Sequence, residues 1–185
     1  MSHKPIVANI YMQMALDCEL VSSPGDLLLP GLVQQVFNKY QRQKGISITK
    51  TERAELFTEL SALLSEELLE RTLRLLDEWS IIIYYTPDRL RSIVEFDSKR
   101  NLAQVVRIIP GVNYCKCRYF QRCVLQLPKS EGDEKLELDD NYNQVSFTCD
   151  HMLAQRLHQL LNPKPREQVL TLSQFRYFQD DIYAD

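Results

Sequence analysis

Two stretches decide how this chain folds: YCKCRYF at residues 114–120 and CDHMLAQRL at residues 149–157. They contain four residues that ligate metals, which are Cys115, Cys117, Cys149 and His151. Three thiolates and one imidazole are a frequent ligand set of tetrahedral structural zinc sites, in which no coordination position stays open. We therefore predict that these four residues bind one structural Zn²⁺ ion, and that the ion holds the surrounding segments together.

The spacing of these residues suggests how they reach one ion. Cys115 and Cys117 are two residues apart, so on a pleated strand both side chains would leave the same face. Cys149 and His151 come just before a helical pattern, where the helix dipole favours a thiolate. Binding of structural zinc contributes about 10–16 kcal/mol in peptides. We therefore expect that loss of one ligand unfolds the site.

Other uses of these residue types are open. The four residues would alternatively be two unrelated cysteine pairs in a reduced interior. Separately, Cys123 is an alternative to one of the four ligands, although we expect it to be a buried apolar residue, because a cysteine thiol packs as a small hydrophobe. We assign Cys18 to a helical core face and His158 to a surface or core position.

The ligand set also bears on catalysis. A catalytic zinc keeps an open position, and a zinc deaminase needs a glutamate beside its histidine ligand and a tight C-x-x-C motif. Neither feature occurs here, so we predict no catalytic residue, no small-molecule substrate and no enzymatic activity.

The composition is that of a folded protein. The chain has 185 residues, 44% of them hydrophobic, which predicts one domain, or one domain with arms, around a real core. Its formal net charge of -3 gives no general attraction for nucleic acid, so DNA binding would need a local basic patch. The five cysteines are an odd number, which favours a reducing compartment over a disulfide framework. We expect no membrane partner, because no apolar run approaches the roughly 18 residues that a span needs. We expect no signal peptide, because the N-terminus lacks a small-residue cleavage signature.

Hydrophobic periodicity predicts helices in the first half of the chain, over residues 6–21, 32–44, 51–63 and 66–78. Thr49 or Thr51 would cap the third helix, and Ser65 would cap the fourth. The core-facing residues of the fourth would be Leu68, Leu69, Leu73, Leu75, Leu76 and Trp79. The period then changes from 3.6 to 2, which predicts an antiparallel meander of strands over residues 80–85, 92–96 and 103–109.

The second half is less regular. Residues 128–143 are acidic and predict a surface insertion. Val145 and Phe147 predict a short strand, and residues 152–161 and 172–183 predict helices. The predicted fold class is α+β, with a helical N-terminal half, a small antiparallel sheet, a zinc-bound strand-to-helix finger and a C-terminal helix. The expected divisions are a helical arm at 1–50, helices with the meander at 51–110, the finger at 111–162 and the last helix at 163–185.

The order C-x-C, then C-x-H, then alanine three residues after the histidine resembles the SWIM-type zinc-finger family. Here the supporting residues are Ala154 and Phe120, the latter three residues after Cys117. The spacer between the two pairs is longer than in most SWIM fingers, and the acidic segment at 128–143 accounts for most of the excess. The layout of residues 60–183 is similar to that of the SWIM proteins of the Shu complex, whereas residues 1–50 have no counterpart in the resemblance.

This resemblance implies a function. Shu-type SWIM proteins bind paralogues of the RecA-type recombinase and help assemble its filament on single-stranded DNA in homologous recombination. The resemblance therefore implies a nuclear, non-catalytic scaffold in DNA repair, whose zinc maintains the partner-binding surface.

Two alternatives follow from the residues. Residues 51–97 run helix, helix, strand, strand, which is also the order of a winged-helix DNA-binding regulator, although Glu66, Glu67 and Glu70 would repel phosphates from the recognition helix. An adaptor that recruits another enzyme through its finger is a weaker alternative. Basic and aromatic residues are also interleaved near the first cysteine pair, which fits either weak contact with single-stranded DNA or a solvated surface. These residues are Lys99, Arg100, Lys116, Arg118 and Arg122, with Tyr114, Tyr119 and Phe120.

The first and last predicted helices are a further pointer to partners. Both are apolar, and both lie outside the predicted finger. Either would dock on another subunit as a helix in a groove, or the two would pack on each other.

Overall fold

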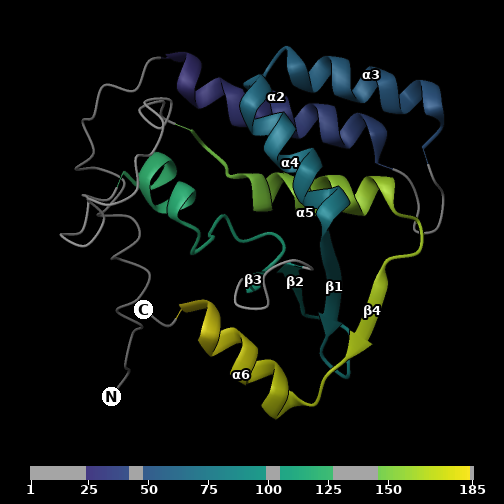
Figure 1. Cartoon of the computed structure of the whole chain (residues 1–185), viewed down its shortest axis with the longest axis vertical. Helices are drawn as coiled ribbons and strands as arrows, with labels where there is room; N and C mark the ends of the chain where they lie inside the picture. The colour runs from purple at the N-terminus through teal and green to yellow at the C-terminus, as the bar shows by residue number, and fades with distance from the viewer. Residues whose placement is uncertain (1–23, 42–47, 99–104, 127–145, 184–185) are drawn as a thin grey trace, which may run out of the picture.

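The computed structural model describes residues 24–41, 48–98, 105–126 and 146–183. The helices are α2 (Pro24–Tyr40), α3 (Lys50–Ser61), α4 (Glu66–Glu78), α5 (Asp150–Leu161) and α6 (Leu172–Tyr183), with a π-helical turn, η1, at Phe120–Val124. The strands are β1 (Trp79–Tyr85), β2 (Ser92–Ser98), β3 (Val105–Ile108) and β4 (Arg166–Val169) (Figure 1). The predicted α+β class is confirmed. The helix expected over 6–21, Cys18, Lys99, Arg100 and the segment 128–143 lie outside the described residues.

Local capping signals fix where α3 and α4 begin. The Thr49 hydroxyl accepts a hydrogen bond from the backbone N–H of Glu52, and the Glu52 carboxylate accepts one from the N–H of Thr49. The Ser65 hydroxyl accepts a hydrogen bond from the N–H of Leu68 in the same way. Such caps satisfy N–H groups that the first helical turn leaves without partners. Both predicted helix starts are therefore confirmed, with Thr49 rather than Thr51 as the cap.

Helix α2 differs from its prediction over residues 32–44. It begins at Pro24 and ends at Tyr40, so it starts eight residues earlier than predicted, with Pro24 as its first residue and Pro30 inside it. Proline is favoured at the start of a helix, where its missing N–H would have had no partner.

None of the described helices is both long enough and apolar enough to span a membrane.

One hydrophobic core lies among the helices. It joins the inner faces of α2, α3, α4 and α5, and its fully buried members include Val33, Leu56, Leu60, Leu153 and Leu157. Of the six residues expected to face the core from the fourth helix, Leu73 does not, since it lies at the edge of the buried stripe and is 38% exposed. Helix α5 packs directly against α4, so it connects this helical layer to the sheet.

The sheet has four strands in the order β3-β2-β1-β4. The meander of β1, β2 and β3 is antiparallel, as predicted. Strand β4 was not predicted; it pairs with β1 in parallel, so the sheet is mixed rather than antiparallel. The REQV sequence of β4 lacks the alternation of a half-buried strand, because three of its four residues are exposed at the edge of the sheet.

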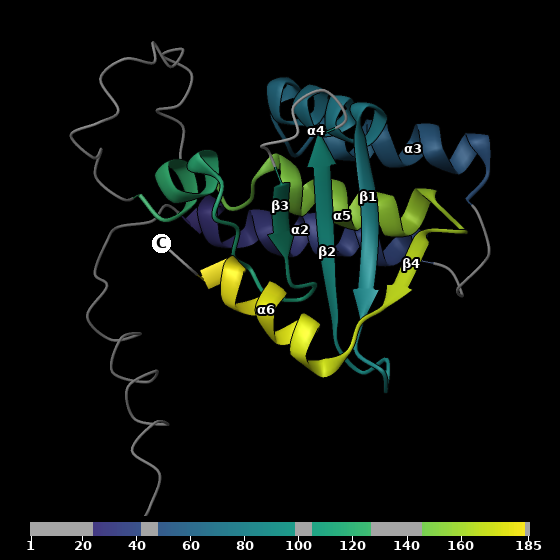
Figure 2. The same cartoon turned by 60° about the horizontal axis from the view of Figure 1, so that its bottom comes forward.

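The two faces of the sheet are covered by different elements. On one face Ile81, Ile83 and Phe96 pack toward α5 and the cysteine-bearing segments. On the other face Ile93 packs against Phe175 and Ile182 of α6. Figure 2 shows α5 and α2 behind the strands and α6 in front of them, next to β3. The sheet is therefore the middle layer of three.

A polar network fastens α6 to the sheet. The Arg107 guanidinium lies 2.6 Å from Glu95 Oε2 on the neighbouring strand and 2.6 Å from Asp181 Oδ2 on α6. It also lies over the Phe178 ring, 4.1 Å from the centroid. The Tyr84 hydroxyl donates to Glu95, and burial together with Glu95 raises the pKa of Tyr84 to about 12, so this donor keeps its proton.

Replacement of Arg107 by methionine should therefore lower the free energy of unfolding by about 3 kcal/mol, because it leaves the buried Glu95 carboxylate without its cation. Urea denaturation of the variant measures the change. The exposed pair between Lys39 and Glu59 supplies the control, since Lys39→Met should change the urea midpoint little. Equal midpoints for Arg107→Met and the wild type would contradict this role for the network.

Candidate metal centre

The first cysteine pair follows β3 across a tight turn. Gly111 in this turn has φ of +83°, a left-handed conformation that glycine adopts without strain. Cys115 and Cys117 then lie in a segment without helix or strand that leads to η1. The prediction that this pair lies on a strand is therefore wrong. The segment instead bends toward η1, where the Phe120 N–H donates to Cys117 Sγ at 3.4 Å and orients that sulfur.

The second pair lies at the start of α5. Cys149 is the residue before the first helical turn, and His151 lies within that turn. Residues 146–149 are not a strand, so the short strand expected at Val145 and Phe147 is not found in its described part. Because α5 is anchored in the helical core by Leu153 and Leu157, its N-terminus holds these two ligands at a fixed place beside the sheet.

The structure brings the four predicted ligands together. The sulfurs of Cys115, Cys117 and Cys149 and a ring nitrogen of His151 all lie within 4.8 Å of one another. In a tetrahedral site with zinc–sulfur bonds of about 2.3 Å, two ligands are about 3.8 Å apart, so the cluster is close to that size. Cys115 and Cys149 are fully buried, and His151 is 8% exposed. These four residues lie close enough to bind one metal ion.

The histidine supplies an independent test of this fit. Within the described part of the chain, neither ring nitrogen of His151 has a hydrogen-bond partner, although both are buried. Its Nδ1 lies 3.2 Å from Asp150 Oδ1, which makes an ion pair only if the ring is protonated. The edges of Trp79 and Phe96 enclose the ring, with centroids 5.8 and 5.7 Å away. A buried imidazole without hydrogen bonds is unusual, and coordination of a cation would satisfy it.

The four groups strongly affect one another's protonation. Hydrogen bonds from Cys117 and Cys149 lower the pKa of Cys115 to about 4, whereas burial raises the pKa of Cys149. The hydrogen bond to Cys115 raises the pKa of Cys117. Burial lowers the pKa of His151, but Asp150 and Cys117 outweigh it and raise that pKa to about 9. Metal ligation requires deprotonated thiols and a neutral imidazole, so a cation that binds here would release protons from these groups.

Other residues singled out in the sequence lie either beside the cluster or outside it. Phe120 and Ala154, which support the motif, are fully buried in the same core as the ligands. Cys123 is 3% exposed and lies outside the ligand group, in agreement with its prediction as a buried residue. His158 also lies outside the group and pairs with Asn162 at 3.1 Å.

The segment of the first pair is also bound to α6. Between the two cysteines, Lys116 Nζ donates to the backbone oxygen of Asp181 at 2.8 Å. Tyr114 stacks on Tyr183 with ring centroids 5.6 Å apart. Farther along, Arg71 of α4 lies over the Tyr119 ring at 4.6 Å. The rings considered for base stacking are therefore engaged in contacts within the protein, which the sequence alone did not predict.

No known protein family, no curated protein and no solved structure matches the chain.

Substitution of Cys149 by serine or of His151 by alanine should abolish metal binding, because a closed site does not form with three ligands. Metal content per chain, measured by inductively coupled plasma mass spectrometry, should fall from one ion to none. Cys123→Ser is the matched control and should retain one ion. Retention of a full ion by His151→Ala would remove the histidine from the ligand set.

Replacement of Lys116 by methionine should weaken metal binding by about 1 kcal/mol, or roughly fivefold, because the ligand segment loses its attachment to α6. Competition with a chelating dye measures the dissociation constant. Lys50→Met, an exposed change on α3, is the control. If Lys116→Met binds metal as tightly as the wild type, the position of α6 does not affect the metal centre.

Proposed function

We propose that the ion is Zn²⁺ and that the chain is a SWIM-type zinc-finger protein without catalytic activity. The ligand set carries this proposal. Three sulfurs and one imidazole fill a tetrahedral zinc site and leave no position for water or substrate, as in structural zinc sites. The buried surroundings of the cluster also favour a structural ion, since a catalytic metal must be reached by its substrate.

We further propose that the protein is a scaffold subunit of a Shu-type complex. It binds paralogues of the RecA-type recombinase in the nucleus and promotes assembly of the recombinase filament during homologous recombination. The support is the motif itself, with Phe120 and Ala154 packed beside the ligands, together with the order of helix, hairpin, finger and terminal helix. In this role zinc stabilises the surface that the partner recognises.

The winged-helix regulator has less support. Its recognition helix would be α4, whose Leu68, Leu69 and Leu75 are buried against α5 and the sheet. The exposed first turn of that helix carries Glu66 and Glu67, which repel a phosphate backbone. A salt-titrated assay with duplex and single-stranded DNA separates the two functions, because tight and sequence-dependent duplex binding would favour the regulator.

The scaffold function is tested by affinity purification of the tagged full-length chain from its source cells, with partners identified by mass spectrometry. We expect one or more recombinase paralogues to co-purify with the wild type and with Cys123→Ser. We expect His151→Ala to lose them together with its zinc. Absence of any recombinase paralogue from a complex that contains zinc-loaded protein would overturn the scaffold function while leaving the zinc site intact.

A further inference from the structure

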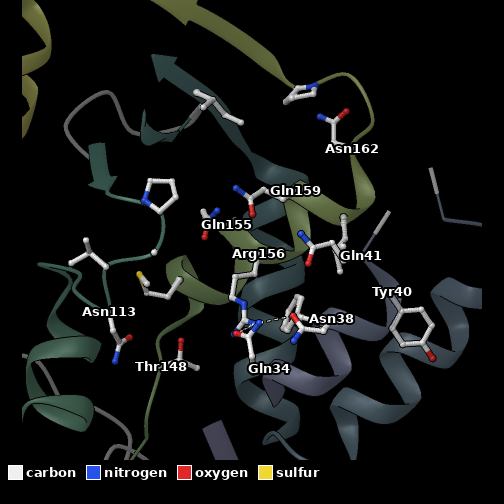
Figure 3. A pocket seen from close by; sticks show the side chains of 18 of the residues that line it. Gln34, Asn38, Tyr40, Gln41, Asn113, Thr148, Gln155, Arg156, Gln159 and Asn162 are labelled. Atoms are coloured by element: carbon white, nitrogen blue, oxygen red, sulfur yellow. Dashed lines mark hydrogen bonds between the residues drawn. The ribbon is translucent and has the colours of Figure 1, made fainter. Parts of the chain in front are cut away.

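A cavity of about 800 Å³ is lined by α2, α5 and the end of β1, and its lining includes Thr148 and Met152, the chain neighbours of Cys149 and His151. One wall consists of α2 and α5, and the others are the end of β1 with residues 110–113, residues 147–148 and the loop at 162–165 (Figure 3). A volume of roughly 300–1,000 Å³ is typical of ligand-binding sites. Because separate segments line it, the cavity is a product of the tertiary fold rather than of one local turn.

The lining is rich in carboxamides. Seven of the 23 lining residues are asparagine or glutamine. Three of them, Gln34, Asn38 and Asn162, already make hydrogen bonds within the protein. The other four, Gln41, Asn113, Gln155 and Gln159, offer the cavity carboxamides that both donate and accept hydrogen bonds. Gln155 and Gln159 extend from α5 into the open space on the side of Asn113 (Figure 3). A partner that itself alternates N–H donors and C=O acceptors is complementary to such a surface, and a polypeptide backbone has that pattern.

Gln155 offers the cavity a carboxamide group from α5. Its side chain belongs to the buried part of α5 and is only 4% exposed. It faces the cavity, and within the described part of the chain its carboxamide makes no hydrogen bond. Its carboxamide is not among the sealed, unpartnered polar atoms of the core, so it opens onto the cavity and is available to bond to an occupant.

The cavity also contains one uncompensated positive charge. Arg156 is half-buried, lies over the Phe37 ring at 4.0 Å and donates from Nη2 to Gln34 Oε1 at 2.7 Å. Among the described residues no carboxylate pairs with it, and burial lowers its pKa. The lining carboxylate, Glu167, forms an ion pair with Arg89 instead. The guanidinium therefore has donors available to an anionic group.

We propose that this cavity is a binding cleft for an extended peptide segment of a protein partner. The bound segment carries one aspartate or glutamate. The carboxylate pairs with Arg156, and the peptide backbone hydrogen-bonds to Gln155 and Gln159. This inference rests on the proposed scaffold function only in that the partner is a protein; it does not depend on which protein that is.

Charge favours a peptide over a nucleic acid. A nucleic acid presents a phosphate at every nucleotide, and its binding requires several lysine or arginine contacts. Within the described lining, Arg156 is the one cation, and it shares the cavity with Glu167. One positive charge matches one carboxylate, and paired guanidinium and carboxylate groups form short, strong hydrogen bonds.

The cleft is also coupled to the metal centre through the chain. Residues 110–113 end two positions before Cys115, and Thr148 directly precedes Cys149. A metal ion bound by these four residues would therefore tie two walls of the cleft together. Loss of the ion should loosen the cleft, so peptide binding should require the metal-loaded protein.

The test is selection of peptides from a phage-displayed random nonapeptide library on the metal-loaded full-length chain, followed by fluorescence polarisation with the selected peptides. We expect them to share one acidic residue, and we expect replacement of that residue by its amide to weaken binding about 30-fold. Arg156→Gln should weaken binding by a similar factor. Arg53→Gln, an exposed arginine on α3, is the matched control and should bind normally.

Gln155→Glu provides a second variant of nearly unchanged shape. It places a negative charge in the cleft, so it should also weaken binding of the acidic peptides by at least about tenfold. Circular dichroism and metal content must match the wild type for each variant. A variant that fails this check is replaced by Gln159→Glu, which lies on the exposed part of α5 and should weaken binding in the same direction.

Three results would overturn the inference. The first is that no peptide is selected, and the second is that the selected peptides lack a common acidic residue or bind Arg156→Gln as well as the wild type. The third is that a twelve-residue oligothymidylate displaces the peptides, which would make the cleft a nucleic-acid site. Selected acidic peptides without any recombinase paralogue among the purified partners would support the cleft and refute only the scaffold function.

Discussion

The meeting of two distant ligand pairs is the constraint on which the other features depend. Cys115 and Cys117 lie in a segment without regular hydrogen bonding, and the π-helical turn after them is short. Such a segment has little stability of its own. Its place beside the sheet is fixed by the first turn of α5, which brings Cys149 and His151 to the same point. Two unlike parts of the molecule, an irregular segment and a well-anchored helix, thereby meet at one cluster.

The three layers follow from this arrangement. One face of the sheet is closed by α5 and the ligand segments, and the opposite face is closed by α6 through Phe175 and Ile182. Lys116 connects the two sides, because it lies between two ligands yet bonds to α6. The amide-lined cleft lies between the helices α2 and α5 and the end of β1. The polar character of its lining is consistent with a surface that exchanges water for the groups of a partner.

Much of the fold can be predicted from local sequence signals. The caps at Thr49 and Ser65 and the alternation in β1 and β2 act over a few residues, and they predicted those elements well. The grouping of the ligands followed from their chemistry. Strand β4 and the irregular backbone at Cys115 and Cys117 could not be predicted from the sequence, since both are imposed by tertiary contacts rather than by propensity. The cleft could not be predicted either, because its glutamines and Arg156 have the sequence pattern of an ordinary solvent-exposed helix face.

The pairing of β4 with β1 has a consequence for how the protein is made. These strands are neighbours in the sheet but are separated in the chain by the rest of the sheet, both ligand pairs and α5. During synthesis, the meander is translated before β4, so one edge of β1 has no paired strand at that stage. An unpaired strand edge can pair with a strand of another chain. Non-local pairing of this kind is slow to form. The nascent chain is therefore most vulnerable to aggregation in the interval between translation of the meander and translation of β4.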